Sequence, residues 1–353
     1  MTIALDIGAD CLRSLRVQDG RLVGRSSRSV YAVLSDSPAQ RELLRQGRIP
    51  FASCEENLIL LGDAATELSQ VFHVPTRPLL PEGRLPQDDA FARQVLGALI
   101  DRLLPAVERA GQICCLTLPA ADRDTSSRAG DLVAFVTQVL RLRGYQPMIL
   151  GSAMGVVLAE LGSVGFTGVG MVFGASHSEA VVVHHGIEMA RCEVALGGSW
   201  IDEQLAQSRE YFLWDSAGRQ YLDVPRAAAL RTAVSLNVVS PNHAEVRGYF
   251  HELARSLMAE LAQTLRGNSA ATMIPQPLKV VASGAAARIN GFDVLLQQVL
   301  RETELPVEIG SIRVAVDSNY NVARGCLIGA QLENDARSRE ADGPPAQPLT
   351  SAA

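Results

Sequence analysis

Short apolar runs and stretches of helical spacing follow one another along this chain. Apolar positions three and four apart predict helices over residues 126–143, from Trp200 onward, and over 251–266 and 292–303. Between them, mostly apolar runs predict buried strands, which read "TIALDIG", "QICCLTLP", "PMILGS", "LKVVASGAA" and "LPVEIG", with a further strand-like segment over 192–198. This alternation of strands and helices is typical of an α/β fold.

Two hairpins in this pattern repeat one another. Residues 170–186, "GMVFGASHSEAVVVHHG", give a strand, a turn of small residues, a second strand and another turn. Residues 3–22, "IALDIGADCLRSLRVQDGRL", have the same outline, with the hairpin-turn pair Asp19-Gly20. Corresponding positions are 166 residues apart without a gap, which aligns Asp6 with Val172, Gly8 with Gly174, Val17 with Val183 and Gly20 with Gly186. The simplest explanation is a duplicated α/β domain.

Composition and charge exclude several classes of protein. The 353-residue chain has a net charge of -6 and no long basic run, so we expect neither nucleic acid nor an anionic membrane as a partner. Its single lysine, Lys279, is not in a Gly-Lys-Ser/Thr motif, which excludes a Walker P-loop.

The six cysteines form no C-x-x-C pair, which favours reduced core thiols in a cytoplasmic protein. Glu160 and several glycines interrupt the apolar stretch 154–175, so we expect no membrane span, and no signal peptide is recognisable.

Five motifs, in order, resemble those of the actin-like ATPase superfamily, which includes actin, the DnaK-type chaperones and bacterial MreB, and the resemblance is greatest to MreB. The motifs are "LDIGADCLRSLRV", "VFGASHSEAVVV", "LGGSWIDEQL", "VVASGAAARINGF" and "DSNYNVARGCLIGA". The resemblance implies a two-domain actin-like α/β fold of duplicated ribonuclease H-like units. Domain I would comprise residues 1–150 and 318–333, and domain II residues 151–317. The outer subdomain of domain II would be reduced to a short segment over 207–247. The polar, proline-containing composition of residues 334–353 separately predicts a disordered tail.

The same resemblance implies a nucleotide site between the two hairpins, with ATP and magnesium as cofactors. The residues implied to bind nucleotide are Asp6, Gly8, Ala9, Gly174, Ser176, Gly198 and Gly284, and Asp6 would also face the metal. Glycines in the turns let backbone N–H groups approach phosphates closely. A carboxylate positions the metal, which in turn neutralises phosphate charge.

The chain departs from the superfamily pattern at the groups that carry out hydrolysis. Val172 replaces the second metal-facing aspartate, and Gly151 stands where MreB-like chains carry a glutamate. The adenosine motif reads Ala-Ser-Gly-Ala over 282–285, and the base-bracketing segment 231–234 reads "RTAV", without its acid. No residue is therefore identified as catalytic, and we expect a degenerate (pseudo-)ATPase with weak or absent ATP binding and little hydrolysis. His177 either contacts phosphate in place of a threonine or is a solvated or core-packed side chain.

Two functions remain open at this point. The first is an MreB-like cytoskeletal role in cell shape, with self-association or a protein partner. The alternative is a non-polymerising scaffold, comparable to PilM, that binds a partner protein. Because the outer subdomain is short and the hydrolysis groups are missing, we expect no ATP-driven filaments.

Overall fold

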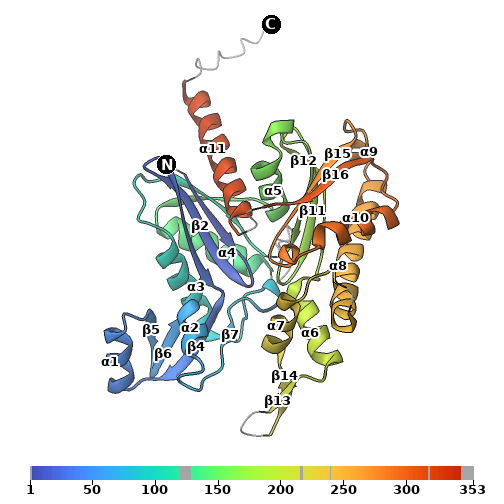
Figure 1. Cartoon of the computed structure of the whole chain (residues 1–353). Coiled ribbons are helices and arrows are strands. Elements are labelled where there is room, and N and C mark those ends of the chain that lie inside the picture. Colours follow the sequence, from blue (N-terminus) through green and yellow to red (C-terminus); the bar gives the residue numbers. More distant parts are fainter. Residues whose placement is uncertain (1, 120–128, 215–217, 239, 317–318, 343–353) are drawn as a thin grey trace.

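The structure of the chain is a computed structural model that describes residues 2–119, 129–214, 218–238, 240–316 and 319–342. Over these residues the largest elements are two five-stranded sheets (Figure 1). The first sheet contains β1 (Ile3–Ile7), β2 (Cys11–Gln18), β3 (Arg21–Arg28), β8 (Gln112–Thr117) and β9 (Tyr145–Ile149). The second contains β10 (Gly168–Phe173), β11 (Ser178–His184), β12 (Ile187–Val194), β15 (Leu278–Ser283) and β16 (Ile309–Val314).

The two sheets have the same topology. Their strand orders are β3-β2-β1-β8-β9 and β12-β11-β10-β15-β16. In each sheet the three hairpin strands are antiparallel, and the last two strands run parallel to the first hairpin strand. The spacing of 166 residues extends beyond the hairpins, because it separates both ends of β3 from those of β12 and both ends of β8 from those of β15. The predicted duplication is therefore confirmed.

Helices cover both faces of both sheets (Figure 1). The main helices are α3 (Ala90–Leu103), α4 (Ala129–Leu142), α5 (Ser152–Glu160), α8 (Pro241–Arg266), α10 (Phe292–Glu302) and α11 (Asn321–Asp342). Helices α3 and α4 pack on the first sheet, and α8 and α10 pack on the second. The core under α8 and α10 includes Phe292, whose ring packs edge-on against Phe173 and Phe250 with centroid distances of 4.8 and 5.9 Å.

Helices α5 and α11 lie between the two sheets and pack against each other. Two glycines allow this close approach, because a Cβ atom on Gly325 would lie 1.8 Å from the carbonyl oxygen of Gly155. At the end of α5, the carboxylate of Glu160 accepts hydrogen bonds from Arg313 at 2.6 Å and from Asn321 at 2.8 Å, and it also contacts Arg324. This carboxylate therefore ties α5 to β16 and to the first turn of α11.

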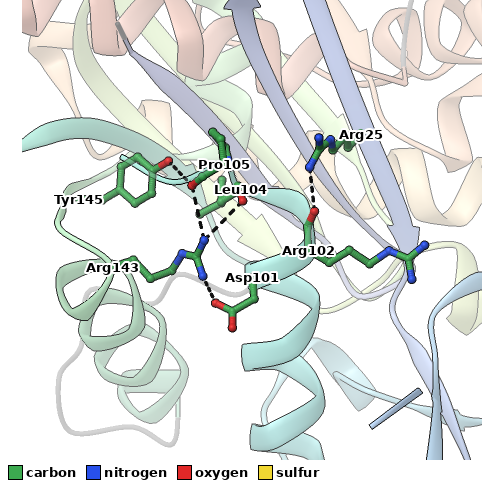
Figure 2. Close-up of polar contacts among 7 residues, drawn as sticks. All are labelled: Arg25, Asp101, Arg102, Leu104, Pro105, Arg143 and Tyr145. Carbon is green, nitrogen blue, oxygen red and sulfur yellow. Dashed lines mark hydrogen bonds and ion pairs between the residues drawn. The ribbon is translucent and has the colours of Figure 1, made fainter. Parts of the chain in front are cut away.

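The C-terminal end of α3 is held by side chains from β3, from β9 and from the turn between α4 and β9. Figure 2 shows their donated hydrogen bonds to carbonyl oxygens, which run from Arg25 to Arg102 at 3.0 Å, from Tyr145 to Pro105 at 2.9 Å, and from Arg143 to Leu104 and Pro105, both at 3.4 Å. The last carbonyl groups of a helix lack partners within it and carry partial negative charge, so cationic donors are favourable there. These contacts fix α3 against β3 and β9, and thereby support the sheet that carries the first hairpin.

Smaller elements extend from each half of the molecule (Figure 1). The first half carries a four-stranded sheet in the order β5-β6-β4-β7, together with two helices. The strands are β4 (Val30–Ser35), β5 (Phe51–Cys54), β6 (Asn57–Leu61) and β7 (Arg77–Pro78), and the helices are α1 (Pro38–Gln46) and α2 (Asp63–Leu68). The second half carries α6 (Gly198–Ser208), β13 (Phe212–Trp214), β14 (Gln220–Leu222), α7 (Val224–Ala233) and α9 (Ser269–Thr272). The β13–β14 hairpin projects from one end of the molecule and exposes Leu213, Trp214 and Tyr221.

Two predicted segments differ from the structure. The strand predicted at "LPVEIG" starts later, because Val307 turns into the core and pairing with β15 begins only at Ile309. The chain after Asn334, which was predicted to be disordered, continues as α11 to Asp342 and includes an ion pair between Arg337 and Glu333 at 2.7 Å. Such i,i+4 pairs stabilise exposed helices. The rest of the predicted tail, 343–353, lies outside the described residues. Among the described helices, none is long and apolar enough to cross a membrane.

Candidate functional site

The turns of the two hairpins face each other across a small cavity of about 80 Å³. Six of the seven residues predicted to bind nucleotide line it, namely Asp6, Gly8, Ala9, Gly174, Ser176 and Gly284. The two turns have the same hydrogen bond, since Gly8 N–H donates to the Cys11 carbonyl at 3.1 Å and Gly174 N–H donates to the His177 carbonyl at 3.0 Å. The duplicated hairpins thus form the two walls of one site.

Gly198, the seventh predicted residue, lies behind the cavity wall. Its N–H donates to the Gly174 carbonyl at 2.9 Å, so it supports the second turn from the start of α6. Arg231 of α7 lies over Gly198 and forms two hydrogen bonds with Asp202, at 2.6 and 3.0 Å. Arg231, the first residue of the segment matched to the base-bracketing motif, is therefore held by a neighbouring carboxylate.

Asp6 is largely buried at the floor of the first hairpin, and two side chains already contact its carboxylate. The Thr117 hydroxyl donates to Oδ1 at 2.8 Å, and the Arg13 guanidinium lies 3.6 Å from Oδ2. Arg13 is directly opposite Asp6 in the pairing of β1 with β2, and it also lines the cavity. Burial raises the pKa of Asp6, while Arg13 and Thr117 act in the opposite direction.

The second hairpin carries a different charge arrangement. Val172 lies opposite Glu179, the position that corresponds to Arg13 in the duplication. Glu179 is 2% exposed and forms an ion pair with Arg191 at 2.7 Å. Burial raises the pKa of Glu179, and Arg191 opposes that change. A Cβ atom on Gly151 would lie 2.8 Å from the Glu179 carboxylate and 3.1 Å from the Arg191 guanidinium, so this pair occupies the space that a larger residue at 151 would need.

His177 is a partly buried residue of the cavity wall. Its Nδ1 lies 3.2 Å from the Ser176 hydroxyl. Burial, together with the nearby positive charge of Arg191, lowers the pKa of His177 to about 4. The side chain is therefore neutral at pH 7 and adds no charge to the site.

A turn from the first half of the molecule contacts two residues of the cavity wall. A Cβ atom on Gly83, in the turn Pro81–Gly83, would lie 2.9 Å from the Ser176 hydroxyl oxygen and 3.0 Å from Pro119. Glu82 and Gly83 both have positive φ angles, 53° and 75°. Sites for small organic ligands usually measure about 300–1,000 Å³. The cavity is therefore smaller than a usual site for a whole nucleotide and is closer in size to a phosphate group.

The residues present fit phosphate better than they fit magnesium. Arg13, Arg288, Ser152 and Ser176 line the cavity together with Asp6 and Asp10, and Ser152 begins helix α5, whose N-terminal end favours anions. A divalent ion beside Asp6 would also lie near the Arg13 guanidinium, whose positive charge opposes the attraction of the Asp6 carboxylate. Within the described ranges, no group of three or more His, Cys, Asp or Glu side chains could hold a metal ion.

Sequence reasoning missed several cavity residues. Asp10, Arg13, Ser152, Arg288 and Asn319 all line it. Arg13 could have been found by counting pairs outward from the Gly8 turn, because that register places it opposite Asp6. Arg288 and Asn319, which are hydrogen-bonded to each other, come from separate segments that only the tertiary fold brings together.

The chain shares its fold, two facing α/β units with paired hairpins across one cavity, with solved structures of MamK and MreB5. The chain is similar over 94% of its length to 99% of a chain in the structure "MamK double helical filament", at 15% identity and a TM-score of 0.66. MreB5 of Spiroplasma citri bound to ADP is similar at 14% identity and a TM-score of 0.64, and bound to AMPPNP at 13% and 0.66, with 97% of this chain and 98% of that chain covered in each case.

The particular family is shown by sequence. A family model described as Volactin matches residues 1–330, so the chain belongs to the Volactin family. A search of curated proteins gave no match.

Proposed function

We propose that this chain is an actin-like cytoskeletal protein that assembles with copies of itself, binds adenine nucleotide weakly and hydrolyses it little, if at all. The observation that carries the hydrolysis part is the state of the two acid positions. Val172 has no carboxylate, and the space beside Gly151 is filled by the Glu179–Arg191 pair. Removing a catalytic group typically lowers rates by orders of magnitude.

The apolar β13–β14 hairpin supports self-association. Trp214 is 64% exposed and Tyr221 51%, and with Leu213 they lie on β13 and β14. This hairpin projects from one end of the molecule, in the outer part that we propose is reduced (Figure 1). Exposed apolar groups of this kind often mark interaction surfaces. A head-to-tail contact that does not close into a ring produces a filament. The MamK relative forms a double helical filament, and MreB5 of Spiroplasma citri binds ADP and AMPPNP.

Pelleting and electron microscopy, with and without ATP and magnesium, test this proposal. We expect assembly that is independent of nucleotide and that is lost in Trp214→Glu. Leu142→Glu is the matched control, because Leu142 is 77% exposed at the end of α4 on the other half of the molecule. Filaments that form only with ATP would contradict the proposal. Absence of assembly in every condition would favour the alternative, a non-polymerising scaffold for a partner protein.

A further inference from the structure

The carboxylate that would face a metal in this site already has a positively charged neighbour. Asp6 and Arg13 are cross-strand partners on β1 and β2, with 3.6 Å between the Arg13 guanidinium and Asp6 Oδ2. Both side chains are mostly buried, at 13% and 17% exposure, and both line the cavity between the hairpins. The positive charge beside the Asp6 carboxylate is therefore supplied by a side chain of the protein.

Arg13 retains donor capacity for a ligand. A guanidinium has five N–H donors, and its single contact with Asp6 is longer than a typical charge-assisted hydrogen bond of about 2.8 Å. Arg288 supplies a second guanidinium to the same cavity, and its hydrogen-bond partner Asn319 is uncharged. Arginine is well suited to phosphate oxygens because its planar group donates two parallel hydrogen bonds.

The second hairpin offers no ligand that would retain a divalent ion. Val172 is apolar, and the nearby carboxylate of Glu179 is committed to Arg191. That carboxylate also accepts from the backbone N–H of Ala153 in the first turn of α5. Magnesium needs near-octahedral oxygen ligands at about 2.0–2.1 Å. Neither carboxylate of the cavity is uncommitted, because Asp6 has one oxygen bonded to Thr117 and the other 3.6 Å from Arg13, and Asp10 is paired with Arg28 at 2.7 Å.

We infer that this site binds the phosphates of a nucleotide without a divalent cation, and that the Arg13 guanidinium supplies the positive charge that a metal would otherwise provide. This inference rests on the proposed nucleotide binding. It goes beyond it by naming the ligand as the free, metal-less anion and by assigning charge neutralisation to a residue of β2. Because the single charge of the Arg13 guanidinium replaces the double charge of a divalent cation, the affinity for the nucleotide is modest.

The test is isothermal titration of the full chain with ADP, once in excess EDTA and once in millimolar magnesium. We expect the two dissociation constants to agree within about threefold, which is well under the factor of ten that 1.4 kcal/mol represents. Arg13→Gln should weaken binding in EDTA by about tenfold or more, because a charge-assisted contact is lost. Arg13→Lys keeps the charge and should bind measurably. The matched control is Arg16→Gln on the same strand, because Arg16 bonds Gln18 outside the cavity and should leave binding unchanged.

The outcomes separate this inference from the proposed function. Binding that requires magnesium overturns the inference and leaves nucleotide binding intact. No binding of ADP in either buffer overturns both. Unchanged affinity of a folded Arg13→Gln variant in EDTA also overturns the inference. If Arg13→Gln does not fold, the comparison of the two buffers on the wild-type chain still decides the question. Electron paramagnetic resonance of manganese provides a further readout. A sample of manganese, ADP and the wild-type chain should give the same manganese signal as manganese and ADP without the protein.

Discussion

Adding one methyl group at Gly325 should separate the two helices that join the halves of the molecule. In Gly325→Ala, the new Cβ would lie 1.8 Å from the Gly155 carbonyl oxygen, so α5 and α11 must move apart by more than 1 Å. Overpacking of this kind costs about 1–3 kcal/mol and sometimes more. Because the obstacle is backbone, we take the upper end, about 3 kcal/mol, and subtract about 1 kcal/mol for the better helix propensity of alanine. The expected net loss is about 2 kcal/mol.

Two other glycines of the same crossing make this prediction a graded series. On Gly329, one turn further along α11, a Cβ would meet side chains alone, the nearest being the end of Leu158 at 3.3 Å, so Gly329→Ala should be neutral or stabilising by up to about 1 kcal/mol. On Gly155 it would lie 3.1 Å from the Val322 carbonyl oxygen, which predicts an intermediate result.

The assay is thermal unfolding by circular dichroism, supported by urea denaturation. For a large domain, 1 kcal/mol corresponds to about 2 °C, so Gly325→Ala should melt roughly 6 °C below Gly329→Ala. Equal melting temperatures for these two variants, or a Gly325→Ala variant that melts above wild type, would refute the reasoning. Either result would mean that α5 and α11 do not touch at these glycines.

Two further predictions concern the cleft. In the double variant Gly83→Cys, Ser176→Cys, the two Cβ atoms would be 3.6 Å apart, which is within the usual disulfide range of about 3.5–4.5 Å. Mild oxidation should therefore cross-link the two halves of the molecule and block nucleotide entry. A folded, oxidised variant without the cross-link would disprove the contact. Burial lowers the pKa of His177 from 6.5 to about 4, so the unfolded chain binds more protons than the folded one between those pH values. Wild type should therefore lose stability as pH falls from 6.5 toward 4, by about 3 kcal/mol more than His177→Gln does. Urea unfolding at pH 7 and pH 4 measures this, and parallel pH dependence in the two proteins would contradict it.

Local patterns were enough to predict the hairpins and their repetition. The strands β1, β10 and β15 are apolar runs ended by small-residue turns, and a spacing of 166 residues can be read from the letters alone. The late start of β16 could not be predicted, because its pairing begins only after Val307 has entered the core. The length of α11 was missed because its last part is polar on all sides.

The polar contacts of the site were harder to predict than its walls. Asp6, Gly8 and Gly174 lie in motifs, so the sequence places them in the cleft. The Glu179–Arg191 pair depends on a diagonal relation between β11 and β12, because the residue directly opposite Arg191 is Val181. That pair fills the space beside Gly151, which belongs to a different element, so no pattern along the chain reveals it.

Helix α11 is long enough that a small tilt at its buried end produces a larger displacement at its C-terminal end. Its 22 residues span about 33 Å, at about 1.5 Å per residue. The first part, from Asn321 to Ala330, is packed between the sheets, and Arg337 further along still donates a hydrogen bond to Gln146 of β9 at 2.5 Å. The helix beyond Arg337 extends away from the body toward the C-terminus (Figure 1). A tilt of about 10° of the whole helix about its first turn would move its far end by about 6 Å, since the helix is about 33 Å long. A small change in the angle between the two sheets is therefore amplified outside the molecule, where a probe attached beyond Asp342 would report it.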